Sequence, residues 1–176
     1  YLLSLPLFIF SLFLFFVTIR DFFGKNINIS QKISHFGFSL LILSILLNGV
    51  LAKEHSSNMR VGDEIKFLDK IIQFQNIEVI KKQNYQTLIG KFNIVDENNS
   101  LSLKPEIRIY DQPETITSEA DISSTIFADN FLVFNIIKND GFYNVRYQVK
   151  PFMIWIWISV LLISFGGILS LKKKNV

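Results

Sequence analysis

Cysteine is absent from this 176-residue chain, and its absence excludes several kinds of chemistry at once. No disulfide, thiolate nucleophile, CxxC redox pair or zinc–thiolate site can form within the chain. The absence does not exclude an oxidising compartment. The sequence also lacks GxSxG, HExxH and any glycine-rich phosphate loop, and its carboxylates are scattered. We therefore assign no catalytic residue from motifs.

Polar residues are scarce in three long blocks, at 1–19, 33–52 and 151–171, and 49% of the whole chain is hydrophobic. Each block has about the 20 residues that a helix needs to cross a bilayer core of roughly 30 Å. We therefore predict three transmembrane helices. The first block lacks the basic start and the cleavage site of a signal peptide. Because Tyr1 already lies within a span, we expect a C-terminal fragment of a longer protein.

Acidic residues are rare beside the spans, and this asymmetry predicts the orientation. The loop 20–32 holds three basic residues and one acid, and the tail 172–176 holds three lysines and no acid. The positive-inside rule places both in the cytoplasm or the mitochondrial matrix. The stretch 53–150, with 12 basic and 14 acidic residues, is expected in the periplasm or the intermembrane space. No basic–aromatic patch indicates nucleic acid.

No convincing helix is predicted in 53–150, where β-branched and aromatic residues alternate with polar ones. The predicted strands are 65–68, 72–80, 85–95, 101–110, 131–137 and 142–149. Turns or caps are expected at 60–63, 96–100, 117–120, 129–131 and 139–141. The last of these, Asn-Asp-Gly, is a hairpin signal. The chain thus predicts a membrane protein with α-helical transmembrane segments plus an extramembrane all-β domain, a small barrel or a sandwich.

His35 lies in the block 33–52, which has no charged residue. An ionisable side chain within a span is costly, so it is normally functional. Histidine is both a metal ligand and a proton carrier. The alternative is an interfacial histidine at a helix end, hydrogen-bonded to headgroups or to a neighbouring helix. The residue alone leaves both interpretations open.

Residues three and four apart share a helix face, so Ser39 is expected one turn deeper on the His35 face, followed by aliphatic side chains. A small residue there leaves room for a flat apolar macrocycle beside the imidazole. Gln31 and Lys32, one turn towards the cytoplasm, are candidates to meet haem propionates. A second ligand must come from elsewhere. His55, just beyond the span, has no visible partners and is expected to be a solvated residue.

The third block opens with Pro151, which is favourable at a helix start. Trp155 and Trp157 are expected in an interfacial aromatic belt. Gly166 and Gly167 predict a close approach of two helices.

Several segments, in order along the chain, match one known family. They are HFGF at 35–38, LKPEIRIY at 103–110, TSEADI at 117–122, DNFLV at 129–133, YQVKPF at 147–152, WIW at 155–157 and GG at 166–167. With them the chain resembles the C-terminal part of the CcmF family, the haem lyase subunits of cytochrome c-type biogenesis. The combination is specific, although each segment alone would be weak.

The resemblance implies a multi-pass protein of the bacterial or mitochondrial inner membrane. Family members take haem from a haem chaperone, work with other maturation subunits, and join haem to the CxxCH cysteines of apocytochrome c. They also carry a b-type haem between transmembrane helices, held by two histidines, and His35 matches one of them. The other ligand and the tryptophan-rich haem-handling segment lie upstream in the family. This chain alone is therefore not expected to be a competent lyase.

A different class of function is also compatible with the sequence: a structural membrane protein whose outer β domain binds partners and which holds no cofactor. Membrane lipid is a partner in either case. A haem absorbance would discriminate between the two.

Overall fold

The computed structural model describes residues 4–24, 27–96, 99–137 and 141–173. The chain divides into two compact units. The helical unit comprises 1–52, 124–129 and 150–176, and the β unit comprises 53–123 and 130–149. The two units are described separately below.

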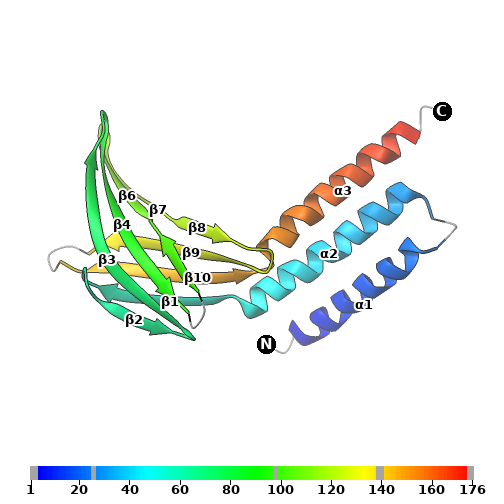
Figure 1. The fold of residues 1–176 in the computed structure, drawn as a ribbon. Helices are drawn as coiled ribbons and strands as arrows, with labels where there is room; N and C mark the ends of the chain where they lie inside the picture. The colour runs from blue at the N-terminus through cyan, green and yellow to red at the C-terminus, as the bar shows by residue number, and fades with distance from the viewer. Residues whose placement is uncertain (1–3, 25–26, 97–98, 138–140, 174–176) are drawn as a thin grey trace. The chain divides into compact units, whose positions relative to one another are not determined.

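Three helices form most of the helical unit (Figure 1). They are α1 (Ser4–Phe22), α2 (Ile29–Leu51) and α3 (Met153–Lys173). Each is long and apolar enough to cross a membrane. Helix α2 packs against both α1 and α3. The three predicted apolar helices are therefore present. Helices α1 and α3 lie two or three residues later in the chain than expected, whereas α2 begins four residues earlier and ends one residue earlier.

Two glycines bring α2 and α3 close together. A Cβ atom added to Gly37 would lie 2.9 Å from Cβ of Leu162, and one added to Gly166 would lie 2.8 Å from the carbonyl oxygen of Ser30. Gly167, in contrast, faces open space, with nothing within 4 Å. The predicted close approach is therefore correct for Gly166, and the HFGF segment contributes its glycine to the same contact.

The β unit is a sandwich of two sheets, which confirms the predicted fold class. Its strands are β1 (Lys53–Met59), β2 (Glu64–Phe67), β3 (Lys70–Lys81), β4 (Tyr85–Val95), β5 (Ser100–Leu103), β6 (Glu106–Asp111), β7 (Glu114–Glu119), β8 (Asp121–Ser124), β9 (Ala128–Ile136) and β10 (Tyr143–Pro151). One sheet has the order β1-β10-β9-β8, and the other has the order β2-β3-β4-β6-β7, with β5 paired to β4. Figure 1 shows the strong curvature of the long strands β3 and β4.

The core lies between the sheets, because alternate residues of each strand point inward. Phe74 and Phe92 come from one sheet and Phe134 from the other. Their rings stack or meet edge to face, with centroids 4.3 to 6.1 Å apart. Gly90 makes room for them, since a Cβ there would lie 2.7 Å from the Phe92 ring and 3.0 Å from the Phe134 ring.

Several predicted strands are confirmed, and the run 85–95 coincides with β4. The run 101–110 is instead two strands, interrupted at Lys104-Pro105, because proline has no N–H to donate to a ladder. The turn at 60–63 is confirmed by the bond from Asp63 N to Arg60 O. The predicted hairpin turn lies partly outside the described residues, since 139 and 140 are not described.

Two predicted turns are wrong. Residues 117–119 belong to β7, and 129–131 belong to β9. Both segments are polar, but cross-strand pairing satisfies their backbone, and this long-range contact overrides local composition. Strands β1, β7 and β8 were not expected for the same reason. In β1 only Met59 is buried, and the strand exists because it pairs with β10 along its whole length.

Candidate functional site

His35 projects from α2 on a face that neither α1 nor α3 covers. The imidazole is exposed, and exposed side chains recur on the same face at helical spacing. They are Gln31, Phe38 and Ile45, with the half-buried Ile42 between them. We call this row, Gln31, His35, Phe38, Ile42 and Ile45, the α2 stripe. It is apolar apart from the imidazole and the Gln31 amide.

The other two faces of α2 are used inside the helical unit. One face contacts α3 through Gly37. The other contacts α1 through Phe36, whose ring centroid lies 5.6 Å from that of Phe15 and 5.9 Å from that of Phe22. Between Gln31 and Ile45, the stripe is therefore the face of α2 that neither neighbouring helix covers.

Ser39 lies in the α1 contact. It is fully buried, and its Oγ lies 2.7 Å from Thr18 Oγ1 and donates to the carbonyl oxygen of Phe36 at 2.9 Å. At 3.6 residues per turn, a step of four residues rotates by about 40°. This rotation takes Ser39 off the stripe and towards α1. A place for Ser39 beside a haem stays a prediction, but the hydroxyl also serves helix packing.

Lys32 also points towards α1. Its Nζ donates to the carbonyl oxygens of Phe22 at 2.9 Å and Gly24 at 2.5 Å. A cation at a helix C-terminus satisfies unpaired carbonyls and interacts favourably with the helix dipole. Gln31, by contrast, stays exposed on the stripe one turn from His35. The structure thus brings Gln31 and His35 together and directs Lys32 and Ser39 to the neighbouring helix.

No cluster of three or more histidine, cysteine or acidic side chains able to hold a metal ion occurs among the described residues. His55, the other histidine of the chain, lies on β1 in the β unit. It was expected to be a solvated residue, but it is half-buried and stacks on the ring of Phe67, with centroids 5.3 Å apart.

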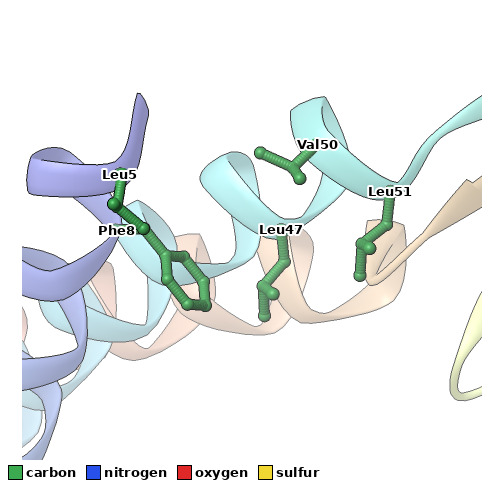
Figure 2. Close-up of a pocket in the computed structure, with 5 residues that line it drawn as sticks. All are labelled: Leu5, Phe8, Leu47, Val50 and Leu51. Carbon is green, nitrogen blue, oxygen red and sulfur yellow. The ribbon is translucent and has the colours of Figure 1, made fainter. Parts of the chain in front are cut away.

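An apolar groove of about 310 Å³ lies between the start of α1 and the end of α2. Figure 2 shows its lining: Leu5 and Phe8 from α1, and Leu47, Val50 and Leu51 from α2. These side chains carry no polar group. A ligand site needs a few placed polar groups to orient its ligand, and the described lining of this groove supplies none.

A buried polar cluster in the β unit was not expected from the sequence. Tyr147 is fully buried, and its hydroxyl donates to Asn130 Oδ1 at 2.6 Å. Lys70 Nζ lies 3.4 Å from both oxygens. Burial, with the negative charges of Asp69 and Asp96, raises the pKa of Tyr147 to about 12. The phenol therefore stays neutral near pH 7 and acts as a structural hydrogen-bond donor.

The alternation of β10 could have placed Tyr147 in the core. Asn130 could not be placed, because its segment was interpreted as a turn.

Comparison with known proteins shows which family the chain is similar to. Residues 50–151 match the family model described as "CcmF C-terminal beta-sandwich". The "Cytochrome c-type biogenesis protein CcmF" of Pseudomonas fluorescens is 25% identical over 146 residues, covering 82% of this chain and 22% of its own length. The "Cytochrome c-type biogenesis protein ccl1" of Rhodobacter capsulatus is 30% identical over 149 residues, with the same coverages.

A solved structure named "Cytochrome c Heme Lyase CcmF" matches the fold. Its TM-score is 0.68 at 14% identity, and the match covers 94% of this chain and 29% of that one. The chain spans about a fifth of the length of the curated relatives that it matches.

Proposed function

Because this chain belongs to the CcmF family of cytochrome c-type biogenesis proteins, we propose that it is the C-terminal portion of a haem lyase subunit in an inner membrane. The family model covers more than half of the chain. Three apolar helices agree with a multi-pass membrane protein. The chain corresponds to only part of such a subunit, so we assign it a share in the reaction and not the whole activity.

The substrates we propose are haem, delivered by a haem chaperone, and apocytochrome c, which receives the haem covalently. Other subunits of the maturation system are the expected partners. We propose that the thiols that accept haem belong to apocytochrome c; this chain has no cysteine with which to supply them. We assign the catalytic segment to the part of the relatives that this chain does not cover.

We further propose that His35 is an axial ligand of a b-type haem. The observation that carries this proposal is the position of His35 on the α2 stripe. A haem site needs an axial imidazole, an apolar slot and polar anchors at one edge. The stripe offers the imidazole, the side chains of Phe38, Ile42 and Ile45 beside it, and the amide of Gln31 at one end.

Each residue then has a defined part. His35 would supply one nitrogen ligand, and a second histidine outside this chain would supply the other. The apolar stripe would exclude water, and the Gln31 amide would be available to donate to a propionate. Ser39 and Lys32 hold α1 against α2, which keeps the stripe uncovered. Haem held by His35 would supply one-electron transfer, which would suit it to keeping the substrate haem reduced for thioether formation.

The test is His35→Ala in the intact protein. We expect loss of the haem, or conversion of a six-coordinate iron to a five-coordinate one, because one axial ligand is removed. Absorbance spectra and haem-to-protein stoichiometry of the purified protein measure this. His55→Ala is the matched control and should change neither. An unchanged six-coordinate spectrum and stoichiometry in His35→Ala would contradict the assignment.

The alternative function, a structural membrane protein that binds partners through its β unit, predicts no haem at all. Purified intact protein without haem absorbance, isolated from cells that supply haem, would favour this alternative.

A further inference from the structure

The turn between β8 and β9 carries two large apolar side chains at its tip. Thr125 closes this turn: its N–H and its hydroxyl both donate to Ala128 O, at 3.0 and 2.8 Å, and its Oγ1 accepts from Ala128 N at 3.0 Å. The two residues between them, Ile126 and Phe127, are 60% and 70% exposed. Turn tips usually hold glycine, proline or small polar residues. An apolar pair here therefore needs an explanation.

The tip is fixed to the beginning of α3. Phe152 N donates to Phe127 O at 2.8 Å, and Trp155 Nε1 donates to Ile126 O at 2.9 Å. Residues 124–129 belong to the helical unit, so their position relative to α3 is defined. Both carbonyl groups of the tip are thus turned towards α3, while both side chains stay exposed.

The beginning of α3 marks the end of a predicted membrane span. The apolar stretch of α3 runs from Met153 to Leu171. Trp155 and the 65% exposed Trp157 lie in its first turns. Tryptophan concentrates at the level of the lipid headgroups, because its amphipathic ring suits the boundary between the apolar tails and water. Because Trp155 is hydrogen-bonded to Ile126, the tip shares this level.

We propose that Ile126 and Phe127 insert into the outer-leaflet interface of the bilayer and anchor the β8–β9 hairpin there. The occupant of this surface is lipid, because the tip continues the apolar surface of a membrane-spanning helix at its interfacial end. The segment 122–128 carries no charged residue, so nothing opposes its entry into the headgroup region. This inference does not depend on the haem proposal.

The absence of cysteine makes the test direct, since each introduced thiol is unique. Ile126→Cys and Phe127→Cys are made in the full chain, labelled with an environment-sensitive fluorophore and reconstituted in lipid nanodiscs. Ile116→Cys is the matched control, because Ile116 on β7 is also 60% exposed. Quenching is measured with lipids that carry a doxyl group near the headgroup, and with iodide in the water.

We expect blue-shifted emission at 126 and 127, strong quenching by the doxyl lipid and weak quenching by iodide. The label at 116 should show the opposite pattern. Iodide quenching at 126 and 127 as strong as at 116 would place the tip in water and overturn the proposal. Protection from both quenchers would show that a protein segment covers the tip, and would overturn it equally.

Discussion

Tyr147 shows how a single polar group is accommodated inside the sandwich. Its hydroxyl is buried with one strong partner, Asn130, and a second donor, Lys70, at the limit of hydrogen-bond distance. A buried polar group is tolerated when it has a hydrogen-bond partner. A buried tyrosinate is unfavourable, because burial and the nearby acidic groups both oppose its negative charge. The contribution of Tyr147 to the free energy of unfolding should therefore change most steeply over the pH range in which tyrosine titrates.

The raised pKa of Tyr147 has a definite sign in alkaline solution. The folded protein keeps the proton up to a pH of about 12, whereas the unfolded chain releases it near 10. The stabilising effect is thus complete below about pH 10 and is lost as pH rises towards 12. We expect the free energy of unfolding to fall over this range by on the order of 2–3 kcal/mol more in the wild type than in Tyr147→Phe.

Denaturant unfolding in detergent, followed by circular dichroism at several pH values, measures this difference. At neutral pH, Tyr147→Phe should be less stable by about 1 kcal/mol, because one hydrogen bond is lost. Parallel pH profiles for the two proteins would contradict the assigned role.

At this scale, the sequence was enough to single out His35, because an ionisable residue within an uncharged span is visible without any structure. It was not enough to place Ser39 or Lys32. The i to i+4 rule puts two residues on roughly one side of a helix, but the position of the neighbouring helix decides which of them is covered. That position depends on Phe15, Phe22 and Thr18, far along the chain.

At the scale of elements, the packing of α2 on α3 depends on small residues. Lipid tails are as apolar as leucine, so helices in a membrane associate by close packing and not by the hydrophobic effect. Gly37 and Gly166 lie directly against the facing helix, where an added Cβ atom would come within 3 Å of it. The adjacent Gly167 does not, which provides a natural internal control.

We expect Gly166→Ala to destabilise the helical unit by about 1–3 kcal/mol, because the added methyl overlaps the backbone of α2. Gly167→Ala should be neutral, or stabilising by up to about 1 kcal/mol, since alanine favours helix over glycine. Thermal unfolding in detergent compares the two variants. Equal effects of the two substitutions would contradict the proposal that close packing at Gly166 holds this helix pair together.

Element prediction succeeded where a strand carries its own pattern. Strand β4 alternates regularly between buried and half-buried residues from Gly90 to Val95, and its predicted ends are correct. Strand β1, with the sequence KEHSSNM, has no such pattern and owes its existence to its partner β10. Pairing between segments about 90 residues apart leaves no local signal, so this strand could not be found from composition.

At the scale of the whole molecule, the distribution of charge predicts which parts face which side of the membrane. The β6–β7 turn around Gln112 is expected outside, and the loop after α1, with the exposed Phe23, is expected inside. Single cysteines at these two positions report the topology, again because the chain has no cysteine of its own.

We expect Gln112→Cys to react with a membrane-impermeant maleimide in intact spheroplasts, and Phe23→Cys to react only after the membrane is permeabilised. The unreacted fraction is measured by a gel shift after denaturation. Reaction of both cysteines from the same side would show that α2 does not cross the membrane, and would refute the three-span arrangement.

The position of the α2 stripe allows the helical unit to fold before the stripe is filled. Helices α1 and α3 complete their contacts with α2 on its other two faces, so the helical unit can insert and pack without using the stripe. Filling the stripe can then be the final step of assembly. Mutations on it should yield a protein that is made, inserted and folded but not loaded, whereas mutations at Gly37 or Ser39 should fail at an earlier stage. Position on one helix thus distinguishes a defect of maturation from a defect of folding.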